Sequence, residues 1–228
     1  MPLTRAKASE VEILAREVVS RVAGLRLRNT ANLRALRREF SKRLEKPSPQ
    51  LFVKLALRFL DEAGIEYRFM AYELICHHRA TLRSLAANQL KLLGHGIDNW
   101  GAVDMFACYL AGPAWRERQV SDALIHKWAR SKDRWWRRAA LVSTVALNSQ
   151  ARGGFGDTSR TLEVCRMLVN DRDDMVVKAM SWALRELAKR DAKAAREFLK
   201  EHENILAARV VREVRNKLTA GLKNPYKK

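Results

Sequence analysis

Apolar residues recur along most of the chain at intervals of three or four, which places them on one face of an α-helix. No segment shows the sustained apolar–polar alternation typical of a β-strand. Segments rich in Gly, Pro and Ser, which end helices, lie at 46–49, 94–98, 111–113 and 152–157. The pattern predicts an all-α protein, with helices over 8–24, 30–45, 49–63, 66–77, 79–93, 99–111, 117–131, 134–148, 157–170, 174–190, 192–202 and 205–221.

The second half of the chain contains an internal repeat. The segment DRWWRRAALVSTVAL, from Asp133, aligns with DDMVVKAMSWALREL, from Asp173, 40 residues later, and a weaker copy begins at Asp98. Each unit spans about two helices, and the length and pattern resemble HEAT-type repeats, which stack into a solenoid with a concave inner face. We therefore expect one α-solenoid domain over residues 1–221, followed by a basic tail over 222–228.

The charge balance points to an anionic partner. The chain has 44 Lys and Arg against 25 Asp and Glu, a net charge of +19, which repels itself unless a partner neutralises it. Nucleic acid fits best, because phosphate contacts release counterions. An anionic membrane surface fits less well, since the basic residues are spread through helices with ordinary cores. Most HEAT solenoids bind proteins, so a scaffold for an acidic protein is the other alternative.

Cysteine usage and the chain start indicate a location inside the cell. Cys76, Cys108 and Cys165 lie far apart in apolar segments, as expected for buried, reduced thiols. The first residues have no apolar signal core, and no run approaches the ~18 apolar residues of a membrane span. No CxxC, HExxH or paired Cys/His spacing occurs, so neither metal nor cofactor is expected. We expect a soluble, cytoplasmic monomer, nucleoid-associated in a bacterium.

Aromatic and charged residues recur on helices expected to line the inner face. Trp100 and Asp104 are four residues apart, and Trp182 and Arg185 are three apart, so each pair shares a helix face. Arg138 occupies the corresponding helix of the repeat between them. Rings interleaved with cations suit a nucleic-acid groove, because cations follow phosphates while rings pack on sugars or bases.

At these positions the sequence resembles the AlkD-type DNA alkylation repair glycosylases, which are built from HEAT-like repeats. The resemblance rests on NWGAVD (99–104), WWRRAAL (135–141) and KAMSWALRELAK (178–189). It extends from about residue 30 to about 215 and is strongest over 97–191.

The resemblance implies a monofunctional glycosylase that removes N3- or N7-alkylated purines from duplex DNA without a deep base pocket. The active surface would comprise Trp100, Asp104, Arg138 and Trp182, and Arg185 would contact a backbone phosphate. Family members usually carry a Tyr in the first helix, whereas residues 15–30 contain none.

This chemistry needs few groups. Alkylation at N3 or N7 makes the purine cationic, so the base leaves as a neutral molecule without a general acid. One carboxylate, Asp104, can stabilise the oxocarbenium-like sugar and aim a water, and indole faces attract the cationic base. Arg138 would hold the adjacent phosphate. Uncharged lesions such as uracil should therefore be poor substrates.

Each candidate also has a structural interpretation. Asp104 could stabilise a helix start, the Trp residues could belong to the core, and Arg138 and Lys178 could pair with the recurring Asp133 and Asp173. A DNA-binding solenoid without catalytic activity is the alternative function.

Further cations are candidate phosphate contacts or a solvated face. Arg34, Arg37, Arg38 and Lys42 share one expected helix face. Arg137 and Lys178 are candidates beside the proposed active surface.

Overall fold

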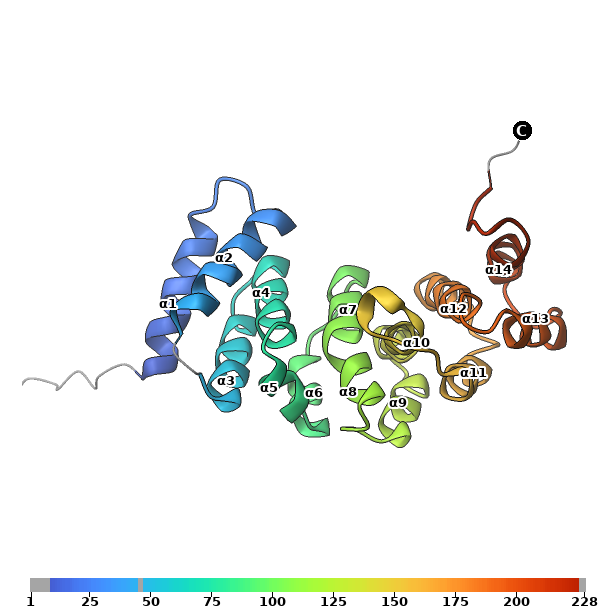
Figure 1. Ribbon diagram of the computed structural model, residues 1–228, viewed down its shortest axis with the longest axis horizontal. Helices are drawn as coiled ribbons and strands as arrows, with labels where there is room; N and C mark the ends of the chain where they lie inside the picture. The colour runs from blue at the N-terminus through green and yellow to red at the C-terminus, as the bar shows by residue number, and fades with distance from the viewer. Residues whose placement is uncertain (1–8, 45–46, 226–228) are drawn as a thin grey trace, which may run out of the picture. The chain divides into compact units, whose positions relative to one another are not determined.

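The computed structural model describes residues 9–44 and 47–225, and all of its regular elements are helical (Figure 1). This confirms the predicted all-α fold. The chain divides into two compact units, one ending at His95 and the other beginning at Gly96. The expected single domain over 1–221 remains a prediction. Residues 222–225 of the expected tail follow the last helix without regular structure, and 226–228 lie outside the described residues, as do the expected helix limits at 8 and 45.

The first unit consists of helix pairs packed against each other. Helix α3 packs against α1 and α4, and α4 also packs against α2. Large apolar side chains such as Phe40, Phe59 and Tyr72 are fully buried between them. Its helices are α1 (Glu10–Ala23), α2 (Thr30–Arg43), α3 (Pro49–Leu60), α4 (Ile65–Cys76), α5 (Arg79–Ser84) and α6 (Ala87–Leu93).

The second unit is also built from packed helices and carries the candidate catalytic residues. Helix α10 packs against α12, α12 packs against α14, and α9 packs against α11, so successive helix pairs stack side by side (Figure 1). Its elements are α7 (Trp100–Phe106), the π-helix η1 (Ala107–Ala111), α8 (Gly112–Arg116), α9 (Asp122–Ala129), α10 (Arg134–Asn148), the 3-10 helix η2 (Gln150–Arg152), α11 (Thr158–Met167), α12 (Asp174–Leu187), α13 (Ala192–Glu201) and α14 (Ala208–Ala220).

The repeated aspartates begin equivalent helices. The Asp133 carboxylate accepts a hydrogen bond from the Trp135 backbone N–H (2.8 Å) at the start of α10. Asp173 accepts one from the Met175 N–H (2.9 Å) at the start of α12. Both residues are therefore N-caps, which satisfy backbone donors that a helix start leaves without partners. The 40-residue repeat is thus a repeat of helix starts in the structure.

Several predicted helix boundaries differ from the structure. The helix expected over 79–93 is two helices, because the chain is extended at Leu85 and the Gln89 side chain accepts a hydrogen bond from the Ala86 N–H (2.7 Å), which begins α6. Helix α9 begins at Asp122 rather than 117, after Arg118 adopts a positive φ of 59°. The last helix begins at Ala208 instead of 205.

The break expected at 111–113 is also wrong, because the helical path continues through Gly112 and Pro113 to Arg116. Proline has no N–H to donate within a helix. The π-helical segment Ala107–Ala111 directly precedes Gly112 and Pro113. Its wider turn changes the local pattern of backbone hydrogen bonds. This segment places α8 against α10, in line with the helix that carries Asp104.

At Gly112 helix α8 lies very close to α10. A Cβ built there would lie 2.5 Å from the Ala146 Cβ and 2.7 Å from the Ser143 carbonyl oxygen. We expect Gly112→Ala to lower the free energy of unfolding by about 1–3 kcal/mol, because overpacking forces the helices apart. Denaturant unfolding measures the change. Gly24→Ala is the matched control, because a Cβ there would lie 3.4 Å from the Ser20 carbonyl oxygen, an ordinary contact distance. Equal stability of both variants would contradict the tight contact at Gly112.

Candidate active site on the second unit

Trp100 and Asp104 are placed by a capped helix start. The Asn99 side chain accepts a hydrogen bond from the Ala102 N–H (3.0 Å), so α7 begins at Trp100. The Trp100 side chain is 63% exposed, unusual for an indole. Asp104 follows one turn later on the same helix face. The expected pairing of an exposed ring with a carboxylate is therefore present on α7.

The Asp104 carboxylate is bound by Arg138 through two hydrogen bonds. Nε donates to Oδ1 and Nη2 donates to Oδ2, each at 2.8 Å. The third arginine nitrogen, Nη1, donates to the Met175 carbonyl oxygen (2.5 Å). The pair therefore joins α7, α10 and α12 at one point. Such a fork-to-carboxylate contact fixes the orientation of the carboxylate as well as its charge.

This pair differs from the structural interpretation of Arg138 in the sequence. Arg138 does not pair with Asp133, which is a helix cap. The Arg138 side chain is only 7% exposed and points at Asp104, and its expected contact with a DNA phosphate stays a prediction. The Asp104 side chain retains 19% exposure, so part of the carboxylate remains open to solvent.

Burial and charge act in opposite directions on Asp104. Burial is the larger effect and raises the pKa of its carboxyl group above the ordinary value, because it disfavours the charged form. The hydrogen bonds and charge of Arg138 lower that pKa, and the charge of Arg152 lowers it further. Asp104 thus needs these cations to remain ionised in its half-buried position.

The remaining tryptophans divide between surface and core. Trp182 lies half-buried on α12, and among the described residues no ring contact joins it to Trp100. Trp136 packs against Phe106 and Trp128, with ring centroids 5.8 and 5.0 Å away. Trp136 is therefore a packing residue.

Arg185 is held so that its terminal nitrogens stay available. Its Nε donates to the Ser181 hydroxyl (3.2 Å), which in turn donates to the buried Glu213 carboxylate (2.6 Å). No described residue accepts a hydrogen bond from Arg185 Nη1 or Nη2. Burial lowers the pKa of its guanidinium, and the charge of Glu213 opposes this. The geometry suits an outside anion such as a phosphate.

Two other candidate cations have partners within the fold. Arg137 forms an ion pair with Asp171 (2.6 Å) and donates to backbone carbonyls at 131–132. Lys178 pairs with Asp174 (2.6 Å), one turn earlier on α12, and not with Asp173. Their proposed contacts with phosphate stay predictions, but both side chains already have structural partners.

The basic row on α2 is only partly a surface feature. Arg34 pairs with the buried Glu73 (3.0 Å), and Arg37 is itself buried beside the same carboxylate (3.6 Å). Arg38 is exposed and pairs with no described carboxylate. The interpretation of one continuous solvated face is therefore wrong at Arg37.

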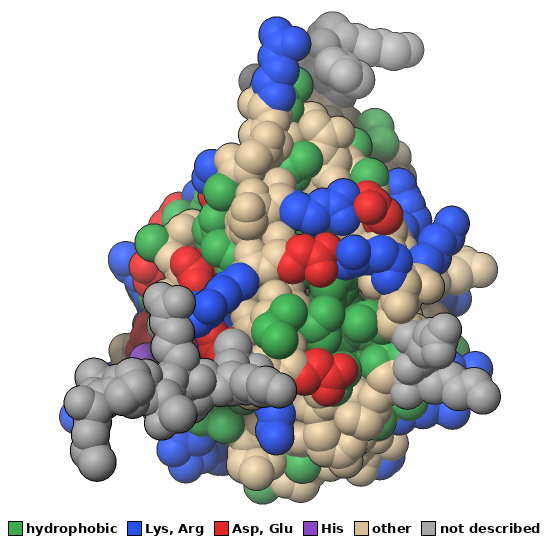
Figure 2. Space-filling view, turned by 90° about the vertical axis from the view of Figure 1, so that its left-hand side faces the viewer, with side chains coloured by type: hydrophobic (Ala, Val, Ile, Leu, Met, Phe, Trp, Pro, Cys, Tyr) green, Lys and Arg blue, Asp and Glu red, His purple; other side chains and the backbone are tan. Residues whose placement is uncertain are grey.

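Figure 2, which views the N-terminal end of the molecule, shows Lys and Arg side chains next to Asp and Glu around an apolar area.

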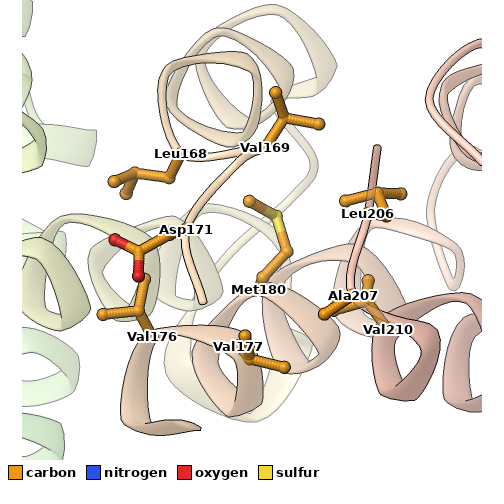
Figure 3. Close-up of a pocket in the computed structure, with 9 residues that line it drawn as sticks. All are labelled: Leu168, Val169, Asp171, Val176, Val177, Met180, Leu206, Ala207 and Val210. Carbon is orange, nitrogen blue, oxygen red and sulfur yellow. The ribbon is translucent and has the colours of Figure 1, made fainter. Parts of the chain in front are cut away.

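The candidate site is a surface rather than a cavity. A small crevice does lie between α11, α12 and the segment leading into α14, but neither Asp104 nor Trp100 lines it (Figure 3). Its lining is apolar apart from Asp171, which pairs with Arg137. The residues that line it are Leu168, Val169, Asp171, Val176, Val177, Met180, Leu206, Ala207 and Val210.

The cysteines take no visible part in the site. All three are free thiols in the structure. Burial raises the pKa of Cys108 and of Cys165 to about 12, which keeps both unreactive, whereas Cys76 is only half-buried. Within residues 9–44 and 47–225, no cluster of three His, Cys, Asp or Glu side chains could hold a metal ion. In the same residues, no helix has the length and apolar character needed to cross a membrane.

The structure adds one cation, Arg152, to the surroundings of Asp104. Arg152 acts electrostatically on Asp104, and its guanidinium lies 5.6 Å from the centroid of the Tyr109 ring. Neither Arg152 nor Tyr109 belongs to a repeat motif, and the segment around Arg152 differs from a phosphate-binding loop, so the sequence offered no signal for this contact.

Comparison with known families identifies the family of the chain. A family model described as DNA alkylation repair enzyme matches residues 21–218, which include every candidate residue of both units. A search of curated proteins finds no match to the chain. Because the match covers most of the chain, the chain belongs to the family of DNA alkylation repair enzymes.

Proposed function

We propose that this protein is a monofunctional DNA glycosylase that hydrolyses the N-glycosidic bond of cationic N3- or N7-alkylated purines in duplex DNA. Membership of the DNA alkylation repair family supports a role in DNA repair. The observation that carries the finer proposal is the Asp104 carboxylate, fixed by both nitrogens of the Arg138 fork and placed one turn from an exposed indole.

The reaction divides between the substrate and these residues. When the bond between the sugar C1′ and the base nitrogen breaks, its electron pair leaves with the cationic base, which becomes neutral. The sugar becomes oxocarbenium-like, and the negative charge of Asp104 stabilises it. A water then adds to C1′ and loses a proton, which leaves an abasic site.

The other residues act on position rather than on bonds. Arg138 is a positioning residue, since it orients and ionises Asp104 from a buried site. Trp100 offers an exposed face to the cationic base, an attraction of about 0.5–2 kcal/mol. Trp182, half-buried on α12, would form a second wall of the same surface. Arg185 would contact a backbone phosphate through its two terminal nitrogens.

One observation favours a second candidate, a DNA-binding protein without catalytic activity. An ion pair that links three helices, as Asp104 and Arg138 do, is also a means of holding a fold together. In that case DNA binding would not depend on the charge of Asp104, and no base would be released.

The test is release of free bases from methylated duplex DNA, measured for N7-methylguanine and N3-methyladenine by chromatography. A uracil-containing duplex is the comparison substrate. We expect both cationic bases to appear and uracil to remain in the DNA, because no general acid is proposed beside Asp104. Efficient uracil release would overturn the cationic-substrate mechanism. DNA binding with a steep salt dependence but no base release would support the second candidate instead.

A further inference from the structure

The segment from Ser149 to Asp157, here called the glycine loop, displays an aromatic side chain to solvent. Phe155 is 75% exposed, which is the highest value for a large apolar side chain in the described residues. The other aromatic side chain among the large exposed apolar ones is Trp100, at 63%. A single exposed apolar side chain is common on protein surfaces, so Phe155 points to a partner only together with the loop that holds it and the cation beside it.

Two arginines from outside the segment, Arg116 and Arg190, hold the backbone of the glycine loop and of the residue before it. Arg190 donates from Nε to the Asn148 carbonyl and from Nη2 to the Gly154 carbonyl, both at 2.8 Å. Arg116 donates from Nη1 to the Arg152 carbonyl (2.6 Å). These bonds tie the loop to the end of α12 on one side and to α8 on the other. The loop is therefore preorganised before any partner arrives.

The glycines give the loop a shape that other residues would not adopt. Gly153 and Gly156 have φ of 77° and 106°, in the region that favours glycine. At Gly154 a Cβ would lie 2.6 Å from the Leu147 backbone, so the chain approaches α10 more closely than a side chain permits. These three glycines fix the backbone path of the loop. The path in turn orients Arg152, which precedes the glycines, and Phe155, which lies between Gly154 and Gly156.

Arg152 links the glycine loop to the Asp104 site. Its guanidinium lies 5.6 Å from the Tyr109 ring centroid, an arrangement that orients the cation without neutralising it. No described carboxylate forms an ion pair with Arg152, although its charge acts on Asp104. The cation is therefore held near the candidate site with its terminal nitrogens available.

We propose that the glycine loop is a preformed DNA-contacting element, in which Arg152 binds a backbone phosphate beside the Asp104 site and Phe155 packs against the duplex. This deepens the proposed function and rests on it for the choice of duplex DNA as partner. A cation with no internal carboxylate partner suits a phosphate, and an apolar ring on a rigid support suits a groove wall or a base step. Because the loop is already ordered, little conformational entropy is lost on binding.

The experiment measures affinity for an undamaged duplex over a range of salt concentrations, by fluorescence anisotropy. Arg152→Gln should weaken binding about eightfold at roughly 0.1 M salt and make the salt slope shallower by about 0.9, the effect of one lost phosphate contact. Phe155→Ser should weaken binding about fivefold or more with an unchanged salt slope, because a packing contact releases no counterion.

Matched variants control for general effects. Arg166→Gln removes the same charge from an exposed position on α11, and Ile205→Ser removes an exposed apolar side chain elsewhere in the second unit. The proposal is overturned if Arg152→Gln and Phe155→Ser bind like these controls.

The outcomes also separate this proposal from the proposed function. If the wild type releases methylated bases while both loop variants behave like their controls, the loop proposal fails and the glycosylase stands. If the wild type releases no base but the loop variants lose affinity as expected, the loop binds DNA and the catalytic proposal fails.

Discussion

Replacing Asp104 by Asn is expected to slow the release of N7-methylguanine and N3-methyladenine by more than ~100-fold, roughly 2.7 kcal/mol at the transition state. Asn keeps the size of the side chain and can still accept a hydrogen bond from Arg138, but it removes the charge that would face the oxocarbenium-like sugar. Single-turnover release from methylated duplex, with enzyme in excess, measures the chemical step without product release.

Asp98→Asn is the matched control, because it removes the same charge from an exposed position just before α7. Both variants raise the net charge by one, so any general gain in DNA affinity is common to them. We expect Asp104→Asn to bind DNA as tightly as this control while losing base release. If the two variants release base at similar rates, Asp104 is a structural residue and the catalytic proposal fails.

The pKa of Asp104 adds a dependence on pH. Since burial raises this pKa, the carboxylate should become protonated at a higher pH than an ordinary aspartate, whose value is 3.8. Base release requires the ionised form, so it should fall as the pH drops through the raised value.

The sequence predicted the parts of this molecule that depend on local pattern. The 3.6-residue periodicity and the lack of strand-type alternation indicated an all-α chain, and the 40-residue repeat located equivalent helices at Asp133 and Asp173. The error at Gly112 and Pro113 has a physical cause. These residues usually end a helix, but a π-helical turn accommodates the proline, and the absent Cβ permits close packing on α10.

The partners of the charged residues could not be read from the repeat. Alignment places Arg138 and Lys178 at equivalent positions, yet Arg138 is buried against α7 and binds Asp104, whereas Lys178 is half-exposed and binds Asp174. The difference arises from the helix that lies beside each one, which is a tertiary property. The same reason explains why the contact between Arg152 and Tyr109 had no signal in the sequence.

Arg138→Gln is expected to lower the free energy of unfolding by about 3–5 kcal/mol at neutral pH, because it leaves the half-buried Asp104 carboxylate without its cation. In the wild type, the hydrogen bonds and charge of Arg138 lower the pKa of Asp104. Removing Arg138 therefore raises that pKa further. The folded variant therefore binds a proton more readily than the unfolded chain. The loss of stability should be largest where Asp104 is ionised and smaller in mildly acidic buffer, where protonation removes the unpaired charge.

Denaturant unfolding at both pH values measures this, and a double-mutant cycle with Asp104→Asn isolates the pair. The double variant should be less destabilised than the sum of the single variants, because it removes both charges together. Arg134→Gln, at the start of the same helix, is the control, since its ion pair with Asp173 is exposed and longer (3.5 Å). Additive losses in the cycle would mean that the Asp104–Arg138 contact contributes nothing specific to the fold. A non-additive loss would show that Arg138 helps to hold three helices together through its contact with Asp104. If base release by Arg138→Gln also begins to fall at a higher pH than in the wild type, the same arginine keeps the proposed catalytic carboxylate ionised.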